Sequence, residues 1–267
     1  MFFDAQLHPR ALRARDLEDL RFFGIEGALV PGGGEVVAAT AAAIRRDWER
    51  LALEVRRLRR LGLAAYGAVA LPPGRIPLRG LEALLAELPD HLGRPEIAAV
   101  GPTGLGDGGE LAERVLARQL ELARDLRLPV LAQVAPRGGA RALRRTVAIL
   151  REAELTPERV LVAAADARAV RTVRACGFVA GLWLGGARAI DQAVRTVSSL
   201  GPEGIVLGSD AGLAGGDPLA LALAADRLAK AGLSDAVVRR VCGENAVAWL
   251  DVDVTLRAGP RARAARR

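Results

Sequence analysis

The chain has 267 residues, of which 51% are hydrophobic and 3% aromatic, so its core must be built mainly from aliphatic side chains. Its formal charge is +7, but the last fourteen residues, 254–267, hold five arginines and no acid, which leaves residues 1–253 at only +2. Length and composition fit one large domain or two small ones, and they exclude a chain too polar to bury a core.

The two cysteines, Cys176 and Cys242, show neither the spacing of a metal site nor a disulfide framework, so we expect packed free thiols. No apolar run approaches the roughly 18 residues of a membrane span, and the N-terminal segment lacks a secretory leader pattern. We therefore expect a cytoplasmic protein with no membrane partner. Segment 254–267 is expected to be a disordered basic tail, with nucleic acid as an alternative partner for its arginines.

Short apolar runs bounded by Gly and Pro recur along the chain, and each predicts a buried strand. The predicted strands are residues 1–4, 27–30, 64–71, 97–101, 130–134, 160–164, 178–184 and 205–209. Stretches with apolar residues three and four apart lie between them and predict helices. These helices are residues 36–61, 109–126, 141–153, 167–175, 190–200 and 219–231.

A last predicted helix, 235–250, follows the good N-cap Ser234 and would cover the outside of the fold. Eight strand–helix repeats over residues 1–253 are typical of a single (β/α)₈ TIM barrel. A doubly wound sheet is the alternative, but the Gly-rich turn expected after its first strand is missing, since Ala5-Gln6-Leu7-His8 stands there. In a barrel, the functional site lies at the carboxyl ends of the strands.

Several segments, in register along nearly the whole chain, resemble the TatD-type metal-dependent hydrolases. Residues 3–8, Phe-Asp-Ala-Gln-Leu-His, are similar to the first-strand His-x-His of that family. Residues 99–106 resemble its fourth-strand Gly-Glu-x-Gly-Leu-Asp, and residues 118–130 resemble the approach to its fifth-strand histidine. Gly208-Ser209-Asp210 matches the eighth-strand Ser-Asp, and Glu244-Asn245-Ala246 is similar to a C-terminal Glu-Asn-Pro.

The resemblance implies a metal site at six positions of the barrel mouth. In chain order the family's ligands fall on Gln6, His8, Pro102, Gln133, Ala164 or its neighbour, and Asp210. Only His8 and Asp210 are imidazole or carboxylate, whereas a zinc-type ion takes at least three such protein ligands even at an open catalytic site. The other histidine, His91, is expected on the far side of the third helix. A carboxylate-only site from Asp4, Asp107, Asp166 and Asp210 is an open alternative.

We interpret His8 and Asp210 as the catalytic or metal-binding pair if there is one, and otherwise as a hydrogen-bonded pair that satisfies two buried polar groups. Gln6 and Gln133 could hydrogen-bond each other where ligands stand in the family. Trp183 is expected in the barrel core, and Gly32–Gly34 as a plain turn rather than an anion cradle. The predicted binding residues are Asp4, Gln6, Gln133, Asp166 and Arg137.

The sequence thus predicts a TatD-like barrel with a degenerate metal site and a non-catalytic role in binding or assembly, a pseudoenzyme. Its partner would be an unidentified small molecule or protein. No cofactor is expected, or at most one weakly bound divalent ion, Zn²⁺, Mn²⁺ or Mg²⁺. The alternative is a metal-dependent hydrolase of phosphoesters, a deoxyribonuclease-like activity, that uses this single ion.

Overall fold

The computed structural model describes residues 1–34, 38–135, 138–213 and 216–254. Its centre is an eight-stranded sheet in which each strand pairs in parallel with its chain neighbours. The strands are β1 (Phe2–Asp4), β2 (Ile25–Pro31), β3 (Ala64–Val69), β4 (Ile97–Thr103), β5 (Val130–Ala132), β6 (Val160–Ala163), β7 (Val179–Trp183) and β8 (Ile205–Gly208). The predicted TIM barrel is confirmed.

The ring closes between β8 and β1 through backbone contacts beyond the regular ladder. The Ala5 amide donates to the Leu207 carbonyl at 3.4 Å, and the Asp210 amide donates to the Gln6 carbonyl at 2.9 Å. The second of these bonds lies just past the carboxyl ends of both strands. It therefore ties together the two segments that carry the predicted His8 and Asp210.

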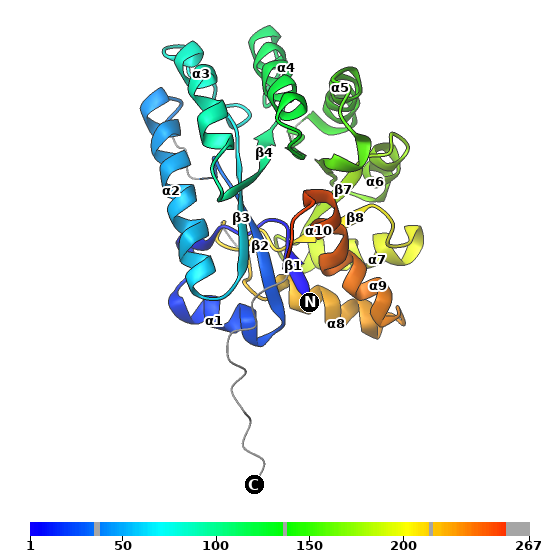
Figure 1. The fold of residues 1–267 in the computed structure, drawn as a ribbon. Helices are drawn as coiled ribbons and strands as arrows, with labels where there is room; N and C mark the ends of the chain where they lie inside the picture. The colour runs from blue at the N-terminus through cyan, green and yellow to red at the C-terminus, as the bar shows by residue number, and fades with distance from the viewer. Residues whose placement is uncertain (35–37, 136–137, 214–215, 255–267) are drawn as a thin grey trace.

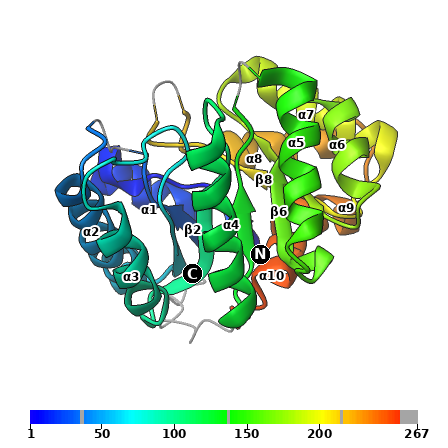
Figure 2. The ribbon, with the colours of Figure 1, turned by 90° about the horizontal axis from the view of Figure 1, so that it is seen from above.

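Helices surround the strands, and the chain passes around the ring in order (Figures 1 and 2). The main helices are α1 (Ala14–Phe22), α2 (Ala41–Arg60), α3 (Leu81–Leu92), α4 (Glu110–Asp125), α5 (Gly139–Glu152), α6 (Ala167–Arg174), α7 (Ala187–Leu200) and α8 (Ala220–Lys230). Helix α1 has no counterpart in the sequence prediction because it buries only Leu17 and Leu20, too few positions for a visible period. No helix of the described residues is long and apolar enough to cross a membrane.

The last predicted helix was misplaced. It is split into α9 (Asp235–Arg239), a π-helical turn η4 (Arg240–Glu244) and α10 (Asn245–Leu250). Instead of covering the outside, η4 and α10 pack on β1 and β8 at the amino end of the barrel, beside the N-terminus in Figure 1. Trp249 joins the interior cluster that contains Phe3 and Leu29. Burial of that indole explains the placement, since the amino end would otherwise expose the barrel core.

Capping side chains start several helices. The predicted Ser234 cap is confirmed, since its hydroxyl accepts from the Val237 amide at 3.4 Å. Thr40 caps α2, which begins at Ala41; the first two residues of the predicted helix lie outside the described residues. Of the predicted tail, only Val254 is described.

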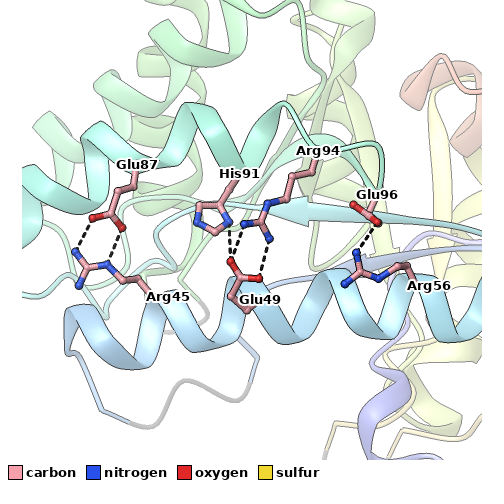
Figure 3. Close-up of polar contacts among 7 residues, drawn as sticks. All are labelled: Arg45, Glu49, Arg56, Glu87, His91, Arg94 and Glu96. Atoms are coloured by element: carbon pink, nitrogen blue, oxygen red, sulfur yellow. Dashed lines mark hydrogen bonds and ion pairs between the residues drawn. The ribbon is translucent and has the colours of Figure 1, made fainter.

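Helices α2 and α3 are joined by a row of charge pairs on the outside of the barrel (Figure 3). Arg45 makes a bidentate pair with Glu87, and Glu49 makes one with Arg94. His91 lies within α3, 9% exposed, with its ring 4.8 Å from that of Trp48 on α2. The second histidine of the chain is therefore a packing residue between two helices and does not belong to the barrel mouth.

Candidate functional site at the barrel mouth

Asp4 ends β1 and ties the first strand to the last. Its Oδ1 atom accepts from the Gln6 amide at 3.0 Å and from the Ser209 amide at 2.8 Å. The carboxyl group is fully buried, and this burial raises its pKa even though both hydrogen bonds oppose the shift. Asp4 is therefore placed under the mouth as a support for the segments on either side rather than as an exposed ligand.

Asp210 follows β8 and faces two side chains from the segment after β1. Its Oδ1 atom accepts from the Gln6 side-chain amide at 3.1 Å and lies 3.6 Å from Nε2 of His8. The longer separation exceeds a hydrogen bond, so the two side chains are neighbours but the predicted His8–Asp210 hydrogen bond is not formed. Burial would raise the pKa of Asp210, but the His8 ring and the Gln6 amide together lower it.

Glycine at position 208 lets these side chains approach. A Cβ there would come within 2.9 Å of the Gln6 backbone nitrogen and 3.0 Å of the Trp183 ring. Trp183 packs on the interior cluster, as predicted, and also lies across Gly181. The indole therefore lies beside Gln6, against the interior cluster.

Unpartnered polar atoms gather at this end of the barrel. Seven buried side-chain polar atoms of the described residues have no hydrogen-bond partner, and five of them belong to mouth residues. These are Oδ2 of Asp4, Oε1 of Gln6, Nε2 of His8, Nη1 of Arg75 and Nε1 of Trp183. Buried polar groups in folded proteins are nearly always paired, and exceptions concentrate at functional sites. The mouth is thus the region of the described chain best prepared to receive a polar ligand.

A cavity of about 200 Å³ opens next to His8. Arg75, Pro102 and Gln133 line it, together with Pro72, Pro73, Leu213 and Gly32–Gly34. Gln133 thus shares a cavity with His8, but the predicted hydrogen bond between Gln6 and Gln133 is wrong, because the Gln6 amide nitrogen is taken by Asp210 and its Oε1 has no partner. Sequence reasoning missed Arg75, although the Pro-Pro-Gly-Arg turn right after β3 was a signal for a charged mouth residue.

The other predicted residues lie elsewhere. Asp166 caps α6 by accepting from the Ala169 amide at 2.8 Å, and Asp107 is exposed in the loop before α4. Arg137 lies outside the described residues. No three His, Cys, Asp or Glu of the described chain lie close enough together to hold a metal, so the carboxylate-only alternative is wrong for these residues.

A second, larger cavity of about 550 Å³ lies between α5 and α6. Its lining is mostly apolar, with Ala163, Ala164 and Trp183 toward the barrel and Arg144 and Arg168 from the two helices. Asp166 contributes to this cavity rather than to the one beside His8. The predicted site residues are therefore divided between two cavities, the one beside His8 and the one between α5 and α6.

The donor set at the family's metal positions is sparse in the structure as well as in the sequence. Pro102 and Ala164 have no side-chain donor, and Gln6 presents its amide N–H₂, a hydrogen-bond donor, to the Asp210 oxygen that a cation would need. Divalent ions of the zinc type require lone pairs from imidazole, thiolate or carboxylate. The residues present therefore do not fit a tightly held pair of metal ions.

Comparisons by sequence and by structure find known proteins that are similar to this chain. A protein of Methanocaldococcus jannaschii described as an uncharacterized metal-dependent hydrolase is 29% identical over 160 residues, which span 60% of this chain and 63% of that relative. A TatD-like protein of Archaeoglobus fulgidus superposes with a TM-score of 0.77 at 23% identity, over 94% of this chain and 100% of its own.

YjjV, a TatD homolog of Escherichia coli K-12, superposes with a TM-score of 0.72 at 17% identity, over 94% of this chain and 98% of its own. No protein-family model matches the chain. The predicted resemblance to TatD-like proteins is confirmed, and the solved structures establish the shared barrel. Metal dependence is stated in the description of the Methanocaldococcus jannaschii protein and applies to that protein.

Proposed function

We propose that this TatD-like barrel has a degenerate metal site and acts by binding a small molecule or a protein at its mouth rather than by metal-dependent hydrolysis. One observation carries the proposal: the side chain at the first ligand position, Gln6, donates its amide hydrogen to Asp210 at 3.1 Å. In the family's pattern, a histidine lone pair at this position and the aspartate would both face a cation. In this chain a hydrogen-bond donor faces the carboxylate directly and takes over the role of the positive charge.

The unpartnered atoms at the mouth support a binding role. A buried polar group without a partner destabilises the fold by roughly 1–3 kcal/mol, so several in one place are retained only where a ligand or water completes them. His8 and Arg75 both lie beside the 200 Å³ cavity. A polar ligand there would supply the acceptor that Arg75 Nη1 lacks.

Metal analysis of the purified protein tests this proposal. After growth with added Zn²⁺ and Mn²⁺, and after gel filtration without chelator, we expect well under one equivalent of either metal. Dialysis against EDTA should leave the thermal unfolding midpoint unchanged. One or more tightly held equivalents, or a marked loss of stability with EDTA, would overturn the degenerate-site proposal.

A second candidate function follows from the pair that remains. His8 Nε2 has no hydrogen-bond partner and lies 3.6 Å from Asp210 Oδ1, so the two could share one weakly held divalent ion. We would then expect hydrolysis of a generic phosphodiester with added Mn²⁺, lost in His8→Ala and kept in His91→Gln, which changes the histidine far from the mouth. Equal activity of wild type and His8→Ala would eliminate this candidate.

A further inference from the structure

We propose that the cavity beside Arg75 binds a small oxyanion group, a carboxylate or a phosphate, with the Arg75 guanidinium as its anchor. This inference rests on the proposed binding function of the mouth and names the ligand chemistry for it.

Arg75 is held in place by its own turn. Its backbone amide donates to the Pro72 carbonyl at 3.2 Å, which closes the Pro-Pro-Gly-Arg turn after β3. Its side chain is only partly exposed, and Nη1 is buried without a hydrogen-bond partner. A guanidinium stays charged under all ordinary conditions, so burying one of its N–H₂ groups unpaired is unfavourable unless an acceptor arrives. The position therefore requires an acceptor that the described residues do not supply.

The rest of the cavity also favours an anion. Among its described lining residues there is no Asp or Glu, while Gln133 can donate through its amide and His8 lies at the edge nearest Asp210. The prolines at 72, 73 and 102 have no amide hydrogen, so the side-chain donors available to an anion there are those of Arg75, Gln133 and His8. The planar fork of a guanidinium matches the two oxygens of a carboxylate or phosphate.

The cavity volume limits the ligand. About 200 Å³ corresponds to the liquid volume of roughly six or seven waters, below the range of about 300–1,000 Å³ typical of drug-sized ligands. We therefore expect a compact acid or the phosphate end of a larger molecule, with the remainder outside the cavity. Carboxylate and phosphate share the chemistry that Arg75 recognises, and the experiment separates them.

The test uses the full chain, treated with EDTA and then dialysed free of it. Thermal unfolding midpoints and calorimetric titrations are recorded with sodium phosphate and with sodium acetate, at ionic strength held constant with NaCl. Wild type should show a saturable rise in midpoint with at least one of the two anions. A response to phosphate alone or to acetate alone identifies the group, and no saturable response to either overturns the inference.

Two variants assign the binding to Arg75. Arg75→Gln should bind the anion roughly tenfold more weakly or not at all, since a charge-assisted hydrogen bond is lost. Arg79→Gln removes the same charge from an exposed position of the same loop and should bind like wild type. Unchanged binding by Arg75→Gln, or equal losses in both variants, would overturn the assignment.

Two further variants cover the other outcomes. Gln133→Glu places a carboxylate in the cavity without changing its shape and should abolish anion binding even if Arg75→Gln fails to fold; retained binding would contradict the proposal. Glu35 follows Gly34 in the chain and lies outside the described residues, so Glu35→Gln is also titrated. If the anion binds only to Glu35→Gln, the Arg75 guanidinium already pairs with the Glu35 carboxylate in wild type, and the inference is overturned.

Metal content measured on the same samples keeps the two proposals apart. Metal-free wild type that fails to bind either anion defeats the anion inference alone. Anion binding that requires added metal, and that persists in Arg75→Gln, defeats the degenerate-site proposal as well.

Discussion

Nε2 of His8 lies 3.6 Å from Oδ1 of Asp210, and the same oxygen accepts a hydrogen bond from Gln6. One carboxylate thus faces both side chains that stand at the positions of the family's first-strand histidines. The Gln6 amide supplies a hydrogen bond to Asp210, whereas His8 Nε2 has no hydrogen-bond partner and His8 lines the adjoining cavity. This arrangement also indicates which single change would move the mouth back toward a metal site.

Gln6→His should restore measurable metal binding. It replaces an amide donor with an imidazole lone pair, so the new imidazole, His8 and Asp210 together give three donor side chains, the number found at open zinc sites. We expect Zn²⁺ affinity at least tenfold above that of wild type, measured by calorimetry with a competing chelator.

The control is Gln6→His combined with His8→Gln, which has two donors again and should return to wild-type affinity. If Gln6→His binds Zn²⁺ no better than wild type, the positions of Gln6 and Asp210 are not suited to a shared ion. In that case the geometry of the mouth, and not only the type of side chain at position 6, would prevent metal binding.

The barrel was predictable because its strands are continuous apolar runs between Gly and Pro, and each predicted strand overlaps an observed one. The chain order of those strands places Gln6, His8 and Asp210 at one end without any side-chain information. Helix α1 was not predicted because it buries only Leu17 and Leu20. The final helix was misplaced because periodicity shows that a helix has an apolar face but not which part of the fold that face covers.

The details of the mouth could not be predicted, because they depend on rotamers and loop paths. The sequence leaves a Gln6–Gln133 hydrogen bond open, and only the folded chain shows that Gln6 donates to Asp210. The sequence is compatible with Asp166 as a ligand or as a helix cap, and the structure shows that it caps α6. Arg75 is one arginine among many in the sequence, and its buried Nη1 becomes visible only in the structure.

Asp4→Asn should stabilise the protein at neutral pH. Burial raises the pKa of Asp4 in the folded state above 3.8, so its contribution to stability is greatest below pH 3.8 and is lost as pH rises through the folded pKa. Asparagine keeps an oxygen to accept from the Gln6 and Ser209 amides and carries no charge. We expect a gain on the order of 1 kcal/mol in the free energy of unfolding at pH 7, shrinking toward pH 4, measured by urea denaturation.

Asp16→Asn provides the control of opposite sign. Asp16 is hydrogen-bonded to Arg13 at the start of α1, and this contact lowers its pKa. The contribution of Asp16 to stability is present above pH 3.8 and lost as pH falls through the lower folded pKa, so Asp16→Asn should be slightly less stable than wild type at neutral pH.

The outcome that would contradict the Asp4 prediction is a loss of stability at pH 7 in Asp4→Asn. That loss would show that the buried Asp4 carboxyl is held in its charged form.

His91 should make the α2–α3 contact sensitive to acid. Burial against Trp48 lowers the pKa of His91, with a further contribution from Arg94, against the opposing effects of Glu49, Glu87 and Asp90. Its contribution to stability is therefore full above pH 6.5 and declines as pH falls through 6.5 toward the lower folded pKa. His91→Phe keeps a ring against Trp48 and should lose less stability than wild type between pH 7.5 and 5.5; identical losses would contradict the prediction.

Thiol reactivity should report on the cap at the amino end of the barrel. Cys242 lies in the π-helical turn η4, and burial raises the pKa of its thiol to about 12, so almost no thiolate is present at pH 8. Cys176 is only partly buried. We expect a disulfide reagent to modify one thiol of the native protein quickly and two in guanidinium chloride. Cys176→Ser should abolish the fast phase, whereas Cys242→Ala should preserve it. The thiol of Cys242 is exposed only when η4 and α10 leave β1 and β8, so its slow reaction measures how often this cap opens. A fast reaction of Cys242 in the native protein would mean that the cap is open for much of the time.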